Sequence, residues 1–218
     1  MIVKRVKYKH FGECIFLSNG ELEIVIPLEF GLRVLKFSLR GKDNIFYEQP
    51  SNDKQFINPS TSWRLYGGHR LWIAPESDKS YYGDNDPISY EIVNNGVNLF
   101  QALDPMLNIK KSMKIQFCKE KDSLIIEHIV KNYDNKPQKL GIWAITTVRE
   151  NGYQVIPFDS DMLGYPPNRH VSLWDTFQLS DPRISFKDNN VIIRHIPIKN
   201  SGKVGFSCHA GYVECYLD

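Results

Sequence analysis

Apolar residues alternate with polar ones along most of this chain, and this period of two constrains the fold more than any other feature. Successive side chains of a β-strand point to opposite faces, so the alternation predicts strands with one buried face and one wet face. No long stretch repeats with the 3.6-residue period of a helix. The clearest strand is Ile109–Phe117, with Ile109, Met113, Ile115 and Phe117 on one face and Lys110, Ser112, Lys114 and Gln116 on the other.

Short turn sequences separate the alternating segments. Asn-Gly, the strongest short signal for a hairpin, occurs at Asn19-Gly20, Asn95-Gly96 and Asn151-Gly152. About a dozen short strands joined in this way, with no helix between them, indicate a sandwich or a barrel. We expect an all-β antiparallel β-sandwich that forms a single domain over residues 1–218, because such folds often reach roughly 200–250 residues.

Three segments carry more specific expectations. Gln138–Val148 is the most continuously apolar segment, and we expect it to be a central strand. Asp159–Asp181 contains Pro166-Pro167 and many polar residues, and we expect a long irregular excursion there. Tyr212–Leu217 is expected to be a strand; either the natural chain continues past Asp218 or this strand is the last of its sheet.

Charge and sequence patterning exclude several classes of partner. The chain has 27 Lys and Arg against 25 Asp and Glu, a net charge of +2, with both signs spread along it. This argues against a nucleic-acid partner or a polybasic membrane surface. No signal peptide is visible, and no apolar run approaches the roughly 20 residues that span a bilayer. The widely spaced cysteines Cys14, Cys118, Cys208 and Cys215 indicate reduced thiols of a cytoplasmic protein.

No motif for a cofactor or a metal stands out. Asp84 and Asp86 offer ligands that calcium accepts, but the later glycine and glutamate of an EF-hand are missing. We therefore expect a solvated loop at these aspartates, and neither a metal nor a cofactor in the protein.

The stretch Trp63–Glu76 is the densest in polar and aromatic chemistry, and we expect the ligand site there. Gly67 and Gly68 permit positive φ or a close approach to the backbone, and a ligand is one group that approaches so closely. The alternative is structural: the glycines form a simple turn, His69 and Arg70 are solvated, and the tryptophans fill the core.

Three further residues have two interpretations each. Arg33 shares a face with apolar neighbours, so it is either a strand-end residue that reaches solvent, the commoner case, or a buried cation with a partner. His128 also lies on an apolar face, which favours a hydrogen-bonded core histidine over a catalytic one. Trp143 either fills the core or stacks on the apolar face of a sugar ring.

Several of these segments resemble a known superfamily. Asn19–Tyr47, with Gly31-Leu32-Arg33 between two strands, resembles the opening of galactose-mutarotase-like β-sandwiches. Tyr66–Glu76 is similar to the most specific motif of a branch of that superfamily whose function is not established, a domain of unknown function. Leu140–Thr147, continuing to Ile156-Pro157, matches the same branch, and the resemblance spans nearly the whole chain.

The resemblance implies an acid–base pair and a set of sugar-holding groups. In aldose mutarotases a histidine is the general acid on the ring oxygen and a glutamate the general base on the anomeric hydroxyl. Here His69 is the implied acid and Glu76 the implied base. The central-strand histidine of mutarotases is replaced by Trp143, and Glu214 is the candidate counterpart of their late-strand glutamate. The implied substrate-binding residues are Arg33, Arg70, Trp72 and Trp143.

The expected function follows from this site. We expect a β-sandwich that binds a small-molecule carbohydrate, with an aldose 1-epimerase-like isomerase activity if it is an enzyme. The main alternative is a non-catalytic carbohydrate-binding or interaction module on the same scaffold. A weaker third interpretation is a lyase- or hydrolase-associated sandwich that uses Tyr66 or Tyr81 as a base. The fold alone does not choose among them.

Overall fold

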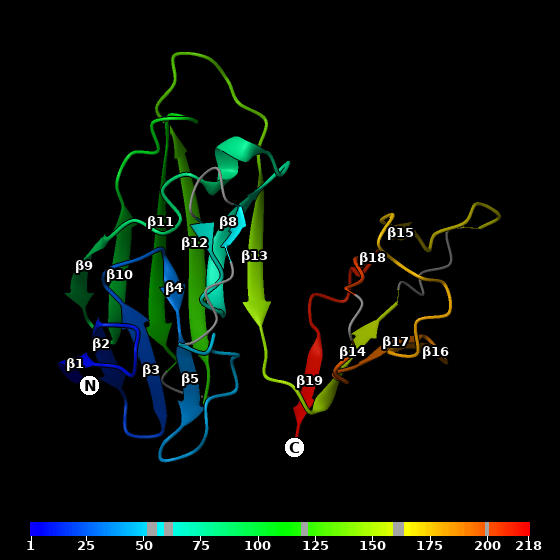
Figure 1. Ribbon diagram of the computed structural model, residues 1–218, viewed down its shortest axis with the longest axis horizontal. Coiled ribbons are helices and arrows are strands. Elements are labelled where there is room, and N and C mark those ends of the chain that lie inside the picture. Colours follow the sequence, from blue (N-terminus) through cyan, green and yellow to red (C-terminus); the bar gives the residue numbers. More distant parts are fainter. Residues whose placement is uncertain (52–55, 59–62, 119–121, 159–163, 199–200) are drawn as a thin grey trace. The chain divides into compact units, whose positions relative to one another are not determined.

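The computed structural model describes residues 1–51, 56–58, 63–118, 122–158, 164–198 and 201–218 (Figure 1). Within these ranges the regular structure is almost entirely β, with antiparallel pairing throughout and a single 3₁₀ turn, η1 (Asp78–Tyr81). The expectation of an all-β antiparallel fold is confirmed. In the described ranges no helix has the length and apolar character needed to cross a membrane.

The described residues form two compact units, 1–148 and 149–218. The expectation of one domain over residues 1–218 stays a prediction.

Two four-stranded sheets make up most of the first unit (Figure 1). Each sheet is built mainly from consecutive antiparallel hairpins, as the turn signals predicted. Asn95 adopts a φ of 65° and Gly20 a φ of 105°, the left-handed conformations that such turns require. The first sheet contains, in spatial order, β1 (Ile2–Lys7), β2 (Glu13–Ser18), β3 (Leu22–Pro27) and β5 (Lys36–Leu39); the second contains β12 (Leu124–Asn132), β11 (Ile109–Phe117), β10 (Gly96–Gln101) and β9 (Ile88–Val93).

Alternate side chains from both sheets form one apolar cluster. Ile15 and Ile24 come from the first sheet, and Val97, Met113 and Ile115 come from the second; all are fully buried. This contact between inner faces is the defining feature of a sandwich. The alternation in Ile109–Phe117 therefore located the core face of that strand correctly.

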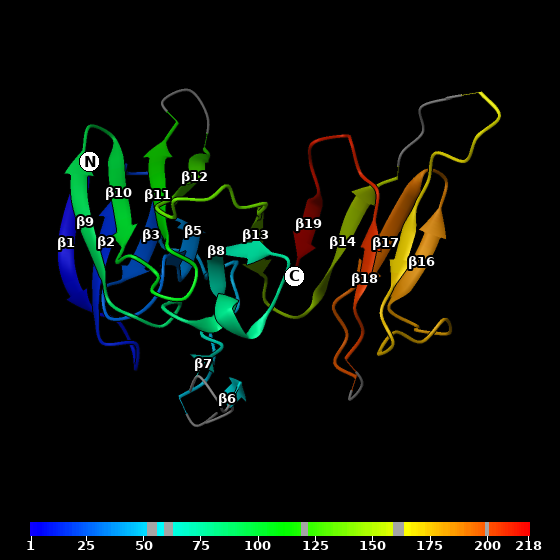
Figure 2. The same cartoon turned by 90° about the horizontal axis from the view of Figure 1, so that it is seen from above.

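A third, smaller sheet holds the predicted ligand stretch. Its order is β13 (Gly141–Thr147), β8 (Gly68–Ala74) and β4 (Arg33–Val34), so β8 is central. Figure 2 shows β8 beside β13. The short strands β6 (Phe56–Asn58) and β7 (Trp63–Arg64) precede β8 in the chain. The expectation that Gln138–Val148 is central is wrong for the described residues, because β13 lies at the edge of its three-stranded sheet and Ile142 is 56% exposed. Beyond its pairing with β8, the segment makes only a single bridge to another described residue, from Val148 to Phe46.

The adjacent glycines Gly67 and Gly68 allow the backbone before β8 to approach the backbone of two other segments closely. Gly67 and Gly68 have φ values of 86° and 74°. A Cβ on Gly67 would lie 2.1 Å from the Tyr47 carbonyl oxygen, and one on Gly68 would lie 2.3 Å from that of Val34. The group that approaches these glycines is therefore the protein's own backbone.

The second unit contains two more antiparallel sheets. The segment Asp159–Asp181 is not wholly irregular, because it contributes a strand that pairs with residues 204–206; its residues 159–163 lie outside the described ranges. The strand predicted at Tyr212–Leu217 is present and shorter, and it pairs only with β14 among the described residues. One sheet has the order β16 (Ile184–Lys187), β17 (Asn190–Arg194), β14 (Gly152–Pro157) and β19 (Glu214–Leu217); the other pairs β15 (Val171–Leu173) with β18 (Val204–Phe206).

Candidate functional site

The strand β8 separates the predicted site residues onto two faces. Its side chains alternate, so Arg70 and Trp72 point to one face while His69 and Leu71 point to the other. Across the pairing register, Arg33 of β4 lies opposite Arg70, and Trp143 of β13 lies opposite Trp72. Arg33, Arg70, Trp72 and Trp143 are thus brought to one side of the sheet, and His69 is not.

Asp84 is the centre of the face that carries Arg70. Its Oδ2 accepts hydrogen bonds from Arg70 Nη1 at 2.7 Å, Trp63 Nε1 at 2.7 Å and Arg33 Nη2 at 3.2 Å. Asp84 is only 1% exposed, so the expectation of a solvated loop is wrong at this residue. Burial alone would raise the pKa of its carboxyl, but Arg70 and Arg33 hold that pKa below the ordinary value and keep the group ionised.

Arg33 is the buried cation with a partner, the less common of its two interpretations. Besides Asp84, it donates from Nη1 to the Gly67 carbonyl oxygen at 3.1 Å. Burial lowers the pKa of Arg33 to about 10, so the guanidinium remains charged at neutral pH. It therefore ties β4 to the backbone just before β8.

Aromatic rings enclose the second guanidinium. The Cζ of Arg70 lies 4.7 Å from the Trp63 ring centroid and 4.3 Å from that of Trp72, and Arg70 is only 7% exposed. Trp72 is fully buried and makes edge contacts with Trp63 and Tyr81. These side chains are occupied with one another, and their evident role is to fix the surrounding backbone.

Lys111 is a residue of this region that sequence reasoning missed. It is only 2% exposed, and its Nζ lies 5.8 Å from the Trp72 ring centroid. Among the described residues no hydrogen bond or ion pair joins it, although Asp84 and Asp104 act on it electrostatically. The sequence pattern could have identified Lys111 as a buried lysine, because position 111 falls on the apolar face of the alternating strand β11.

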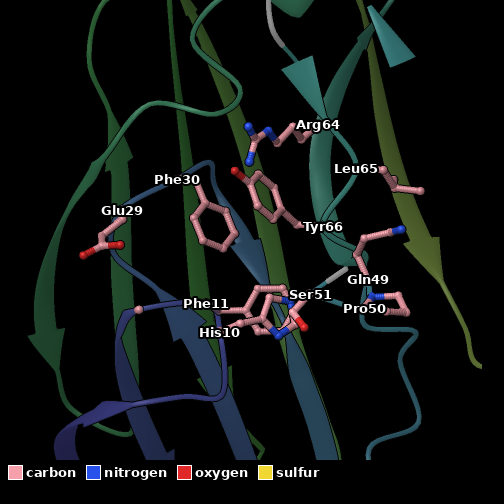
Figure 3. Close-up of a pocket in the computed structure, with 11 residues that line it drawn as sticks. His10, Phe11, Glu29, Phe30, Gln49, Pro50, Ser51, Arg64, Leu65 and Tyr66 are labelled. Carbon is pink, nitrogen blue, oxygen red and sulfur yellow. The ribbon is translucent and has the colours of Figure 1, made fainter. Parts of the chain in front are cut away.

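An open cavity of about 310 Å³ lies beside the Asp84 cluster, which we define as Arg33, Trp63, Arg70 and Asp84 (Figure 3). Three aromatic side chains, Phe11, Phe30 and Tyr66, line it. Phe30 and Tyr66 are stacked, with ring centroids 3.8 Å apart. Figure 3 shows Arg64 beyond the Tyr66 hydroxyl. The polar residues at the rim are His10, Glu29, Gln49, Ser51 and Arg64.

The Asp84 cluster supports the aromatic wall of this cavity. The Cζ of Arg33 lies 5.3 Å from the Tyr66 ring centroid and 5.6 Å from that of Phe30. The same guanidinium is held by Asp84, so one buried ion pair positions both rings. Arg64 and Tyr66 belong to the predicted stretch Trp63–Glu76, whereas Phe11, Glu29 and Phe30 come from segments that sequence reasoning did not connect with it.

His69 lies on the opposite face of β8 and lines a different cavity, also of about 310 Å³. Its Nδ1 lies 2.8 Å from Thr146 Oγ1, and its Nε2 lies 3.0 Å from Nε2 of His128. Burial, with a smaller contribution from His128, lowers the pKa of His69 to about 4. His69 is therefore neutral at pH 7 and poorly suited to give up a proton as a general acid. His128 is half-buried, and its Nε2 pairs with His69 as expected of a hydrogen-bonded histidine, whereas its Nδ1 has no partner among the described residues.

Glu76 follows the end of β8 and is exposed. It accepts a hydrogen bond from the Tyr81 hydroxyl at 2.5 Å. Strand geometry of about 3.3 Å per residue places Ala74, which precedes Glu76 by two residues, roughly 16 Å from His69. The structure does not bring the implied acid and base together.

Neither a metal-binding cluster of described residues nor a similar known protein adds a residue to the candidate site. In the described part of the chain, no three His, Cys, Asp or Glu side chains group in a way that could hold a metal ion. Comparison with known proteins finds no matching family model, no matching curated protein and no matching solved structure. The resemblance to galactose-mutarotase-like sandwiches stays a prediction from the sequence motifs.

Proposed function

We propose that the protein binds a small carbohydrate in the cavity of Figure 3 and does so without catalysis. The observation that carries this proposal is the combination of stacked aromatic rings on the wall and polar side chains on the rim. Pockets of about 300–1,000 Å³ are typical of small-molecule sites, and a cavity of about 310 Å³ suits a single sugar.

The chemistry of the lining matches that of a sugar ring. One face of a pyranose presents C–H groups, which pack against an aromatic ring such as that of Tyr66, while its hydroxyls point outward. Glu29 supplies acceptors and Arg64 supplies donors at the rim of the same cavity. The Tyr66 hydroxyl makes no hydrogen bond among the described residues and can offer one to a sugar.

The separation of His69 from Glu76 favours the non-catalytic alternative over an aldose 1-epimerase. A general acid and a general base must contact one hemiacetal from its two sides. His69 lies near the start of β8, whereas Glu76 lies beyond the end of that strand. The lyase alternative is also disfavoured at Tyr81, because burial and the Glu76 carboxylate raise the pKa of Tyr81 to about 12.

We also propose a cytoplasmic location, supported by the free thiols of Cys14, Cys208 and Cys215.

Sugar binding is tested by saturation-transfer NMR with a panel of neutral aldoses and N-acetylated hexosamines. We expect at least one sugar to bind, and Tyr66→Ala to weaken its binding at least tenfold because the aromatic wall is lost. Tyr66→Phe keeps the wall and should weaken binding less. Tyr133→Ala, which removes an exposed tyrosine outside the cavity, is the matched control. Equal binding by Tyr66→Ala and wild type would place the sugar elsewhere.

Catalysis is tested separately by measuring anomer exchange by NMR for every sugar that binds. The proposal predicts exchange at the rate of buffer alone. Exchange that is faster than buffer and is abolished in His69→Ala and in Glu76→Gln would establish the mutarotase interpretation instead.

A further inference from the structure

Among the described residues that line the cavity of Figure 3, Glu29 alone carries a carboxylate. Gly12, in the turn between β1 and β2, lies directly against it. A Cβ on Gly12 would lie 3.0 Å from Glu29 Cδ and closer still to Oε2. The Glu29 carboxylate therefore occupies the space that a side chain at position 12 would fill, at the edge of the cavity.

The Glu29 carboxylate is available to a ligand. Its side chain is exposed, and in the described part of the chain it takes part in no hydrogen bond and no ion pair. Arg64, which also lines the cavity, differs because it already interacts with other groups of the protein. Glu29 is thus a charged group of the lining that a ligand can engage without displacing an existing interaction.

Three aromatic rings lie in the same cavity. The Phe11 ring centroid lies 6.2 Å from that of Phe30 and 6.5 Å from that of Tyr66. The faces of aromatic rings attract cations, and the buried guanidinium of Arg33 already lies 5.3 Å from the Tyr66 centroid. The aromatic wall therefore suits a positively charged ligand as well as the C–H face of a sugar.

The placement of the charged side chains favours a cation near Glu29. Figure 3 shows Glu29 on one side of the Phe30 ring and Arg64 on the other, next to Tyr66. A cation beside Glu29 can therefore contact an aromatic ring and stay clear of the Arg64 guanidinium. In the same place an acidic group would be repelled by Glu29, and a neutral hydroxyl would gain no attraction between opposite charges.

We propose that the preferred ligand of this cavity is an amino sugar with a free, protonated amine, such as a hexosamine. Its ammonium group donates to the Glu29 carboxylate, and the C–H face of its ring packs on the aromatic wall. Hydrogen bonds between two charged groups are stronger than those between neutral groups, so the amine is preferred over a hydroxyl or an acetamide. This inference rests on the carbohydrate binding proposed above and specifies the class of sugar.

The test compares D-glucosamine with D-glucose and N-acetyl-D-glucosamine, and D-galactosamine with its two corresponding sugars. The full chain is titrated at pH 6.5, where the amine is mostly protonated, and the aromatic ¹H–¹³C signals of Phe11, Phe30 and Tyr66 are followed. We expect at least one amino sugar to bind roughly tenfold or more tightly than both of its uncharged counterparts.

Two variants assign this preference to one carboxylate. Glu29→Gln should fold normally, because Glu29 is exposed, and should remove most of the preference for the amine. Glu21→Gln makes the same change of charge at an exposed glutamate outside the cavity and should leave the preference intact.

Four results would overturn the proposal. Equal binding of an amino sugar and its uncharged counterparts would reject the amino sugar but leave carbohydrate binding in place. An unchanged preference in Glu29→Gln would show that another group selects the amine. Equal loss of preference in both variants would reduce the effect to net charge. Binding of no sugar, charged or uncharged, would overturn the proposed function as well.

Discussion

At the scale of single residues, the site is organised by a carboxylate that sequence patterns placed in a solvated loop. Asp84 joins Arg33, which lies 51 positions away in the chain, and Arg70. The periodicity of its strand left Arg33 with two interpretations, and only a partner could decide between them. That partner comes from a separate loop, so local pattern could not identify it.

Asp84→Asn should destabilise the protein by about 3–5 kcal/mol, because it leaves two buried guanidinium groups without a counter-ion. Urea denaturation measures this loss. Asp86→Asn, at an exposed neighbouring aspartate, is the control and should cost under about 1 kcal/mol. Similar values for both variants would show that the buried pairs contribute nothing specific.

The lowered pKa of Asp84 predicts that the protein loses stability at acid pH. The folded pKa of Asp84 lies below the ordinary value, so the stability that Asp84 contributes is fully present above the unfolded pKa of about 3.9. That contribution should be lost as the pH falls below about 4 and through the folded pKa. The difference in unfolding free energy between wild type and Asp84→Asn should therefore shrink at acid pH, and a difference that stays constant would contradict the assignment.

Lys111→Met should stabilise the protein by more than about 1 kcal/mol at pH 7, because it replaces a buried ammonium that has no hydrogen bond among the described residues. Burial lowers the pKa of Lys111, so the folded state binds this proton less tightly than the unfolded state does. Wild-type stability relative to Lys111→Met should thus rise as the pH approaches the unfolded pKa of about 10.4. A less stable Lys111→Met at pH 7 would mean that the ammonium has a stabilising partner.

At the scale of elements, sequence signals that depend on adjacent residues predicted turns correctly. Signals for contacts between distant segments did not predict the position of a strand in its sheet. The turn at Asn95-Gly96 was predicted correctly because its chemistry depends on adjacent residues. The position of β13 in its sheet was predicted wrongly, because apolar composition indicates neither how many strands lie beside a segment nor, in this strand, whether its side chains are buried. The strand at Val171–Leu173 was missed, since its segment is short and lies between loops.

Gly68→Ala should cost about 3 kcal/mol, because it adds strain at a φ of 74° and sets a Cβ 2.3 Å from the Val34 carbonyl oxygen. Gly20→Ala is a matched control, since its φ of 105° is also positive but nothing lies within 4 Å of the added Cβ. Its cost should be about 1 kcal/mol. Equal costs by thermal denaturation would show that β4 and β8 are not held as closely as described.

At the scale of the whole molecule, the core and the candidate site belong to the same unit. Both described clusters of buried apolar residues lie within residues 1–148, whereas Val191 is the one fully buried apolar side chain described in residues 149–218. Alternation predicted the sandwich core, because one face of each strand had to be apolar. It did not predict the cavity, which depends on loops and strand ends that meet only in the fold.

This uneven burial predicts uneven local stability. Amides of β10 and β11 should exchange with deuterium at least 100-fold more slowly than those of β16 and β17, because few buried apolar contacts hold the latter. Native-state hydrogen exchange on the intact chain measures both sets together. Equal protection would indicate that the two units unfold as one.

The most direct test of the central claim is to map which side chains respond when the tightest-binding sugar of the panel is added. Aromatic ¹H–¹³C spectra of the assigned protein provide this map in one titration. We predict saturable shifts concentrated at Phe11, Phe30 and Tyr66. Shifts concentrated instead at His69 and His128, with those three rings unchanged, would contradict the proposed site.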